Sequence, residues 1–306
     1  MSCAENVALA ERTILEMNNR TFNEDPFGFS PLWDSILDMY EEFSHVCSKH
    51  NLRHYVIGGT LLGAVRHHGF IPWDDDFDIA MPRQDYEKFR EVFSSEMPGW
   101  CKIVDRKNCD EFSTLFLKVQ DSRKEKIAGL ERKLNFTLSN GVFLDIFPID
   151  GYPTGRLSLV CWNIRSGWLW LEARYSVFKR RPGTVIGYLC YWVGAFLHVI
   201  FHRVKSMKTF LDMREKEYRK YYFSDDKRSG MAGCHTNIYQ MTFRERVFGD
   251  PVLLEFNGTK VNAPVDYNEF LRVNFGEEYM TLPPKNKQVP KHSDARDRAW
   301  KFGPTK

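Results

Sequence analysis

The segment from Trp73 to Met81 is dense in aspartates and then turns apolar. If it forms a strand, successive side chains alternate between two faces, so Asp76 and Asp78 point to one side while Phe77 and Ile79 pack on the other. Two neighbouring carboxylates supply the hard oxygen ligands that Mg²⁺ prefers. The spacing therefore predicts a metal-binding pair, although a solvated acidic loop is the plain alternative for such a run.

A further acid, Asp145, lies in the apolar run Val142–Phe147. Burying a carboxylate among large apolar residues is costly unless it has a partner. That partner is either a metal ion or a local group such as a lysine or an arginine. The presence of Asp76 and Asp78 favours the metal ion.

A glycine turn precedes the acids by fewer than twenty residues. The run His54–Ile57 is typical of a short strand, Gly58 and Gly59 end it, and Thr60–His67 is compatible with a helix. Glycines that open a helix let backbone N–H groups approach a phosphate at the positive end of the helix. Either glycine alone indicates no more than a tight turn, but a glycine turn and a carboxylate cluster together favour a phosphate and metal site.

These segments resemble the LicD family. Three segments are similar to the opening, second and closing blocks of that family. They are GGTLLGAVRHHGFIPWDDDFDIAMPRQDYEKF, LDIFPID at Leu144–Asp150 and YNEFLRVNFGEEYMTLPP at Tyr267–Pro284. The resemblance, shared with fukutin-related proteins, implies a nucleotidyltransferase-type fold. It also implies transfer of phosphocholine from CDP-choline to sugars of bacterial surface glycans.

The resemblance assigns roles residue by residue. It implies a catalytic and metal-binding set of Asp76, Asp78 and Asp145, with Asp74 as an auxiliary metal ligand. It implies Mg²⁺ as the cofactor, with Mn²⁺ as an alternative. We expect the substrate-binding residues to be Gly58, Gly59, Thr60, Arg66, Lys118 and Lys285. The three cationic side chains would neutralise phosphate oxygens, although each is equally explained as a surface charge.

The surrounding elements predict an α/β (α+β) fold: a nucleotidyltransferase-like mixed sheet flanked by helices, with a helical insertion. Ser30, followed by Pro31, is expected to cap a helix that runs to about His50. We expect a leader at residues 1–29, a catalytic core at 30–150, a helical insertion at 151–224 and a C-terminal part at 225–306 that completes the catalytic domain.

The stretch Gly183–His202 has no acidic or basic residue and is rich in aromatics, and basic residues flank it on both sides. Its length is near that of a membrane span. A buried pair of core helices, an interfacial helix and a true span all stay open. The basic, amphipathic run Val204–Tyr222 that follows favours a membrane surface, so we expect a peripheral contact through residues 183–222.

Composition limits the cellular compartment and the partners that we expect. The seven cysteines form no CxxC pair, and the N-terminus does not resemble a signal peptide, so we expect a reduced, cytoplasmic protein on the inner face of the membrane. A net charge of +3 is too small to predict a nucleic-acid partner. We expect a CDP-linked alcohol, first of all CDP-choline, as donor and a glycan as acceptor. The rival functions are a nucleotidyltransferase, a metal-dependent phosphodiesterase and a non-catalytic glycan-binding module.

Overall fold

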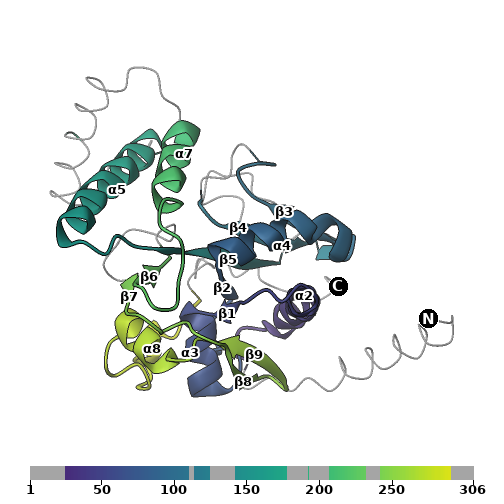
Figure 1. Cartoon of the computed structure of the whole chain (residues 1–306). Helices are drawn as coiled ribbons and strands as arrows, with labels where there is room; N and C mark the ends of the chain where they lie inside the picture. Colours follow the sequence, from purple (N-terminus) through teal and green to yellow (C-terminus); the bar gives the residue numbers. More distant parts are fainter. Residues whose placement is uncertain are drawn as a thin grey trace.

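The computed structural model of the chain describes residues 25–109, 114–124, 142–177, 192, 207–231 and 242–290 (Figure 1). Helices and strands alternate along the first half, and a helix pair and short strands follow. The elements are α2 (Ser30–Lys49), β1 (Tyr55–Val56), α3 (Gly58–His67), β2 (Asp78–Pro82), α4 (Arg83–Glu96), β3 (Cys101–Val104), β4 (Leu117–Asp121), β5 (Phe143–Gly151), α5 (Arg156–Val177), α7 (Met207–Tyr218), β6 (Ser229–Gly230), β7 (Thr242–Phe243), β8 (Val252–Phe256), β9 (Thr259–Ala263) and α8 (Tyr267–Phe275).

The described strands form one seven-stranded sheet and a separate β8–β9 hairpin. The main path through the sheet is β1-β2-β5-β4-β3, and β6 and β7 extend it from the end of β5. β2 and β5 run parallel, whereas β1–β2, β4–β5 and β3–β4 are antiparallel. The sheet is therefore mixed and carries helices, which confirms the α/β (α+β) fold class predicted from the sequence.

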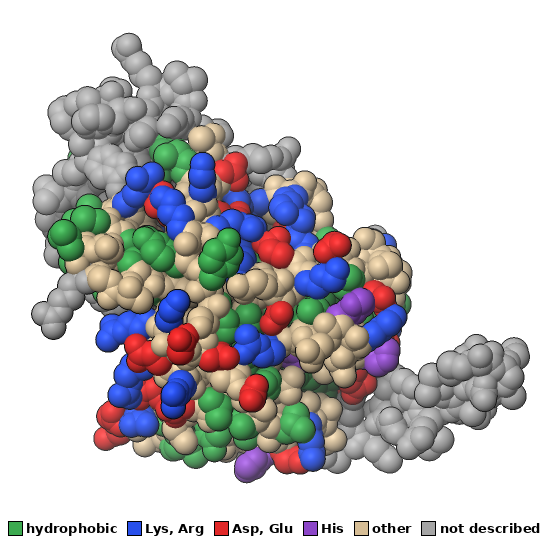
Figure 2. All heavy atoms as spheres, viewed as in Figure 1, with side chains coloured by type: hydrophobic (Ala, Val, Ile, Leu, Met, Phe, Trp, Pro, Cys, Tyr) green, Lys and Arg blue, Asp and Glu red, His purple; other side chains and the backbone are tan. Residues whose placement is uncertain are grey.

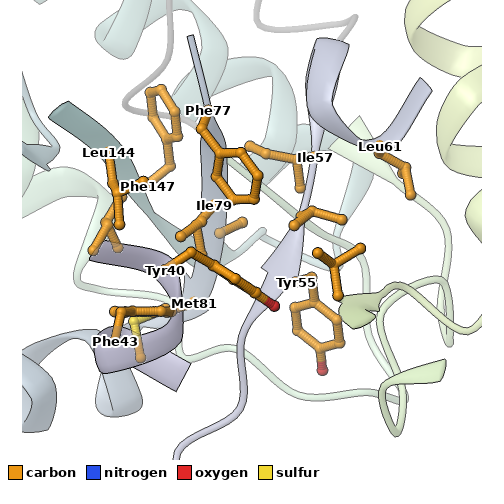
Figure 3. Packing of buried hydrophobic residues seen from close by; sticks show 14 of the residues in the cluster. Tyr40, Phe43, Tyr55, Ile57, Leu61, Phe77, Ile79, Met81, Leu144 and Phe147 are labelled. Atoms are coloured by element: carbon orange, nitrogen blue, oxygen red, sulfur yellow. The ribbon is translucent and has the colours of Figure 1, made fainter. Parts of the chain in front are cut away.

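Alternation along β2 buries one face of the sheet. Phe77, Ile79 and Met81 are fully buried and pack against Tyr40 and Phe43 of α2 (Figure 3). These α2 residues recur at a helical spacing, so the helix presents one apolar stripe to the strands. Asp78, the first residue of β2, lies on the opposite face and is half-buried, whereas Ala80 on that face is fully buried.

The start of α2 corrects one expectation. Ser30 is the first residue inside the helix and not its cap; the cap position is Phe29, which makes no capping bond through its side chain. The carboxylate of Asp25 takes over that role, because it accepts hydrogen bonds from the backbone N–H of Phe29 (2.6 Å) and of Ser30 (2.9 Å). A negative charge at a helix N-terminus is stabilised by the free N–H groups there.

Helices α5 and α7 pack against each other around a small apolar cluster of their own. Trp162 and Leu169 of α5 are buried against Phe210 and Tyr218 of α7. Within the described residues, no helix is long and apolar enough to cross a membrane. The expected segment 183–202 lies outside the described residues except for Trp192, which is helical.

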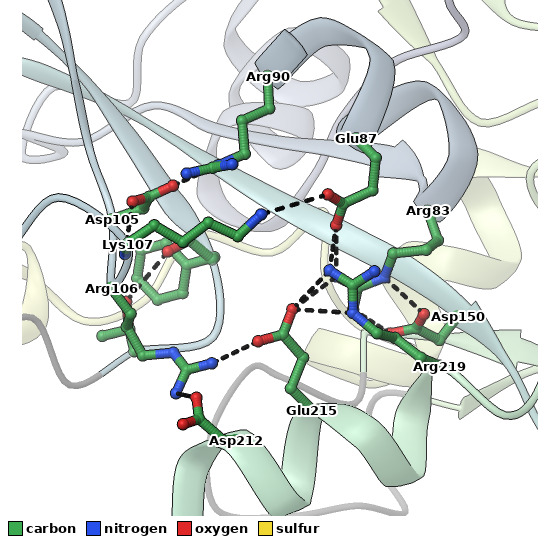
Figure 4. Close-up of polar contacts among 12 residues, drawn as sticks. Arg83, Glu87, Arg90, Asp105, Arg106, Lys107, Asp150, Asp212, Glu215 and Arg219 are labelled. Carbon is green, nitrogen blue, oxygen red and sulfur yellow. Dashed lines mark hydrogen bonds and ion pairs between the residues drawn. The ribbon is translucent and has the colours of Figure 1, made fainter. Parts of the chain in front are cut away.

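Charged side chains join α7 to the core (Figure 4). Arg106, after β3, pairs with Asp212 (2.8 Å) and with Glu215 of α7, and Arg219 pairs with Glu87 of α4. Between them lies a cavity of about 350 Å³ bounded by α4, the loop after β3 and α7. None of the predicted site residues lines this cavity.

A buried ion pair lies beside that network. Arg83 of α4 donates from Nε (2.8 Å) and Nη2 (2.6 Å) to the two carboxylate oxygens of Asp150, at the end of β5. A bidentate pair of this kind fixes both side chains. It ties α4 to β5, the strand that also carries Asp145.

Candidate active site

The sheet register brings two of the predicted acids together. β2 and β5 are neighbouring parallel strands, and Asp78 is the register partner of Asp145. Side chains at partner positions of a parallel pair point to the same face of the sheet. The two carboxylates, 67 positions apart in the chain, therefore share the face opposite the α2 core.

Asp76 departs from the expected arrangement. β2 begins at Asp78, so Asp76 lies in the loop before the strand, and the alternation argument does not apply to it. Asp74 belongs to the same loop and is buried, and its backbone carbonyl accepts a hydrogen bond from the indole Nε1 of Trp33 (3.0 Å). The loop is therefore anchored to α2 and is not a solvated acidic run.

The glycine turn packs directly on the acids. α3 begins at Gly58, two residues earlier than expected, and Gly58 has a φ of +56°. A Cβ at Gly58 would lie 2.9 Å from Oδ2 of Asp78, and one at Gly59 would lie 2.3 Å from Oδ2 of Asp74. Only glycine leaves room for both carboxylates at the positive end of α3.

Thr60 holds the strand that follows the acidic loop. Its side chain is buried, and its Oγ1 accepts a hydrogen bond from the backbone N–H of Asp78 (2.9 Å). The backbone N–H of Ile57 donates to the carbonyl of Asp78 (3.0 Å). Both backbone groups of Asp78 are thus bonded to the segment around the glycine turn, which orients its side chain.

Electrostatic repulsion is concentrated on Asp78. Burial raises the pKa of this carboxyl well above 3.8, and the charges of Asp76, Asp145 and Asp74 raise the pKa further. The ammonium of Lys118 lowers it by a smaller amount. The charges of three other carboxylates thus act on Asp78, and a bound cation would relieve this repulsion.

Lys118 is the cation that the fold itself supplies. It is the register partner of Asp145 on the other side, on β4, and its Nζ forms an ion pair with Oδ1 of Asp145. The same Nζ lies 3.5 Å from the ring centroid of Phe143, and both charged side chains are largely buried. Of the partners considered for Asp145, the structure shows the lysine, while Asp78 lies on the other side of Asp145.

Arg66 links α3, which lies in the opening motif, to the closing block Tyr267–Pro284. Its Nη1 donates to the backbone carbonyl of Tyr279 (2.9 Å) and reaches that of Thr281 (3.4 Å). The carboxylate of Asp74 is the acidic charge that acts on its guanidinium, whose pKa is lowered by burial. Arg66 therefore attaches the closing block to α3 at the edge of the acidic cluster.

The remaining predicted residues lie farther from these contacts. Lys285 is exposed on a single turn of 3₁₀ helix, and none of its contacts in the described residues reaches a site carboxylate. Phe70 is buried and stacks on Trp33 with ring centroids 5.0 Å apart. The bend before the acids is thus packed into the core, and the ring of Phe70 is covered by Trp33.

One contributor was missed in the sequence. Asn257, in the turn of the β8–β9 hairpin, accepts a hydrogen bond at Oδ1 from the backbone N–H of Phe70 (2.8 Å), and its own N–H donates to the carbonyl of His68 (2.8 Å). A Cβ at Gly69 would lie 2.2 Å from that Oδ1. The hairpin therefore clamps the bend that leads into the acidic loop. Its Asn-Gly turn is the sequence pattern from which the hairpin could have been predicted.

The donor set suits a hard divalent cation by its chemistry. Carboxylate oxygens are the ligands that Mg²⁺ takes, and burial, followed by the charges of the neighbouring acids, raises the pKa of Asp78. Among the residues that the structure describes, no three histidine, cysteine, aspartate or glutamate side chains converge closely enough to hold a metal ion as they stand. Asp145 is turned to Lys118 in this arrangement.

Known proteins resemble the chain over the same segments. Residues 51–169 match the model of the LicD/FKTN/FKRP nucleotidyltransferase domain. The lipopolysaccharide cholinephosphotransferase LicD of Haemophilus influenzae is 25% identical over 263 residues, which cover 84% of this chain and 92% of that protein. An uncharacterised protein of Rickettsia prowazekii is 26% identical over 129 residues, covering 41% of this chain and 48% of that protein.

The matched domain contains the glycine turn, the acidic loop, Lys118 and Asp145, so the match covers the site built above. The resemblance to the Haemophilus protein extends over most of both chains. The resemblance drawn from the sequence motifs is confirmed: residues 51–169 match the nucleotidyltransferase domain of the LicD family.

Proposed function

We propose that the chain is a Mg²⁺-dependent phosphotransferase that moves a phospho-alcohol group, phosphocholine first of all, from a CDP-linked donor to a hydroxyl of a cell-surface glycan or its lipid-linked precursor. The observation that carries the proposal is the pairing of Asp78 with Asp145 on adjacent parallel strands, with the glycine turn packed against Asp78. The name of the Haemophilus relative, a lipopolysaccharide cholinephosphotransferase, supports the choice of group and acceptor.

Asp76, Asp78 and Asp145, with Asp74 beside them, would hold the ion. When bound, Mg²⁺ supplies positive charge to phosphate oxygens of the donor. Lys118 contributes a second positive charge on the same face of the sheet, next to Asp145. The backbone N–H groups at the start of α3 add the partial positive charge of a helix N-terminus.

The acceptor hydroxyl attacks the phosphorus of the transferred group in line with the leaving CMP. The oxygen–phosphorus bond to the acceptor forms as the bond to CMP breaks, and Asp78 or Asp145 takes the hydroxyl proton. Burial and the neighbouring carboxylates raise the pKa of Asp78, and a carboxylate with a raised pKa is a stronger base.

The test offers purified protein a panel of CDP-linked alcohols together with lipopolysaccharide and other glycans, with Mg²⁺ or with EDTA. CMP release is measured together with the mass of the product, and Asp78→Asn is the inactive control. CMP plus an acceptor heavier by phosphocholine supports the proposal. A nucleotide-capped acceptor means nucleotidyl transfer, free phosphocholine without a modified acceptor means hydrolysis, and glycan binding without turnover means a binding module.

A further inference from the structure

The cavity of about 350 Å³ between α4, the loop after β3 and α7 is lined mainly by charged side chains (Figure 4). Among the described residues that line it, four are basic and four are acidic. Figure 2 shows basic and acidic side chains interspersed on the surface over α4 and α7. A volume of this size is typical of a small-molecule site. The cavity is therefore large enough for one small polar molecule.

The charges of this lining are already matched within the protein. Arg106 pairs with Asp212 (2.8 Å) and with Glu215. Arg219 pairs with Glu87 and with Glu215 (2.8 Å). A bound anion would have to compete with these carboxylates, and a bound cation would have to compete with the guanidinium groups. The lining therefore favours a neutral ligand whose groups both donate and accept hydrogen bonds.

A buried donor lies beside two of these carboxylates. Nε and Nη2 of Arg83 donate to Asp150. Nη1 lies 3.6 Å from Oε1 of both Glu87 and Glu215, which is too long for a hydrogen bond. This nitrogen is buried, and no group of the described residues accepts a hydrogen bond from it. Because buried polar groups are normally satisfied and both carboxylates line the cavity, the arrangement suits an oxygen of a bound molecule beside Nη1.

The carboxylates of the cavity are held in their charged form. Burial raises the pKa of Glu215, but the guanidinium groups around it, first of all that of Arg219, lower the pKa below its ordinary value. Burial likewise raises the pKa of Asp105, and the hydrogen bond from Arg90 (2.5 Å) helps to lower it below the ordinary value. Hydroxyl groups make strong hydrogen bonds to ionised carboxylates. A ligand with several hydroxyl groups, such as a sugar, meets this requirement.

Two aromatic residues add apolar surface to the cavity. Tyr86 and Phe116 line it, and each is 6% exposed. The ring centroid of Phe116 lies 5.5 Å from Nζ of Lys118, which pairs with Asp145. Aromatic rings with a few polar groups are the usual lining of a small-molecule site, and they suit the carbon face of a sugar ring. The cavity thus adjoins the candidate active site without including any of its acids.

We propose that the cavity binds a neutral pyranose ring of the acceptor glycan. Its hydroxyl groups donate to Glu87 and Glu215 and accept from the guanidinium groups of Arg83 and Arg219, and its carbon face packs on the aromatic side. The bound sugar is not the one whose hydroxyl reacts, because none of the site acids lines the cavity. The assignment of this sugar to the acceptor rests on the proposed function, whereas the binding of a neutral sugar does not.

Saturation-transfer NMR on the full-length protein tests the binding, in EDTA and without a donor. The probes are the methyl glycosides of glucose, galactose, N-acetylglucosamine and N-acetylgalactosamine, and inorganic phosphate is the competitor. We expect at least one glycoside to bind and phosphate to leave that binding unchanged. If none of the four binds, or if phosphate displaces the bound glycoside, the proposal fails.

Substitutions locate the sugar. In Glu87→Ala we expect glycoside binding to weaken about tenfold, since hydrogen bonds to a charged acceptor are lost. The matched control is Glu91→Ala, one turn further along α4, where the side chain is 71% exposed and does not line the cavity. If Glu87→Ala melts lower than the control, Asp212→Ala replaces it, because this cavity residue is 58% exposed. Wild-type binding by the cavity variant, or equal losses in the cavity variant and the control, would overturn the location.

Kinetics connect the cavity to the acceptor. In CMP release we expect Glu87→Ala to raise the KM for the glycan about tenfold and to leave the KM for the CDP-linked donor unchanged. An unchanged KM for the glycan, or an equal rise in Glu91→Ala, would show that the cavity sugar is not part of the acceptor. Failure of the proposed reaction is recognised separately: the wild type then releases no CMP with any acceptor, while glycoside binding still differs between the wild type and Glu87→Ala.

Discussion

Asp78 on β2 and Asp145 on β5 are direct register partners in a parallel pair of strands, and Lys118 is the register partner of Asp145 on the other side. Three ionisable side chains thus stand in one row across the sheet. The row places a resident ammonium at one end and the most strongly repelled carboxyl at the other. Substitutions at the three positions should therefore have different effects on activity and stability.

Replacing Asp78 should separate activity from stability. Asp78→Asn keeps the volume but removes a negative charge that would hold the ion in the proposed reaction, so we expect turnover to fall by about 10² or more. The metal-free variant should melt at a higher temperature than the metal-free wild type, because the amide ends the repulsion from Asp76, Asp145 and Asp74. Thermal unfolding in EDTA measures this, and a lower melting temperature would contradict the repulsion.

The raised pKa of Asp78 also predicts how stability depends on pH. The folded protein holds this proton more tightly than the unfolded chain, whose carboxyl titrates near 3.8. The contribution of Asp78 to stability is therefore full below about pH 4 and is lost as pH rises through the raised folded pKa. Denaturant unfolding in EDTA should show the wild type losing stability relative to Asp78→Asn as pH rises towards 7, and a constant difference would refute this.

Lys118 and Asp145 should show opposite responses to added Mg²⁺. Lys118→Met keeps an aliphatic stem against Phe143 but leaves Asp145 without its cation, which we expect to cost about 1–3 kcal/mol in the metal-free protein. Added Mg²⁺ should restore much of that loss. Asp145→Asn instead strands the Lys118 ammonium, so it should also melt lower, and Mg²⁺ should not rescue it. The melting temperatures of both variants, with and without Mg²⁺, decide the matter.

Alanine substitutions at the two glycines of the turn should impair the protein in different ways. At Gly59, alanine places a Cβ 2.3 Å from Oδ2 of Asp74, so this side chain must move away from the cluster. We expect a loss of turnover of about tenfold or more with little change in melting temperature. Alanine at Gly58 meets a positive φ as well, and should cost about 1–2 kcal/mol of stability. Equal stability losses in the two variants would contradict this distinction.

Asn257 offers a test of the hairpin clamp far from the acids in sequence. Asn257→Ala removes the acceptor for the buried N–H of Phe70, at an expected cost of about 1–3 kcal/mol, and should reduce turnover because the acidic loop loses its anchor. Asn257→Asp retains an acceptor oxygen and is the matched control. Denaturant unfolding and CMP release measure the two effects, and an alanine variant as active and stable as the wild type would exclude the clamp.

Local patterns in the sequence predicted the helices and strands well, but they predicted contacts between distant parts of the chain poorly. The helix expected to run to about His50 matches α2, which ends at Lys49. The cap supplied by Asp25 and the position of Asp76 outside β2 were missed, since both depend on where the backbone leaves a regular element. No local pattern reveals that Lys118 meets Asp145, because that contact depends on the register of β4 and β5.

Contacts from both ends of the described chain hold the candidate site. Asn257 holds the bend before the acids, and the carbonyls of Tyr279 and Thr281 hold Arg66. During synthesis the ribosome releases the acidic loop long before these residues emerge, so a nascent chain has strands and aspartates without their clamps. Contacts so distant in sequence form late in folding. An incomplete chain therefore lacks the contacts that position the first motif, because the residues that make those contacts are synthesised later.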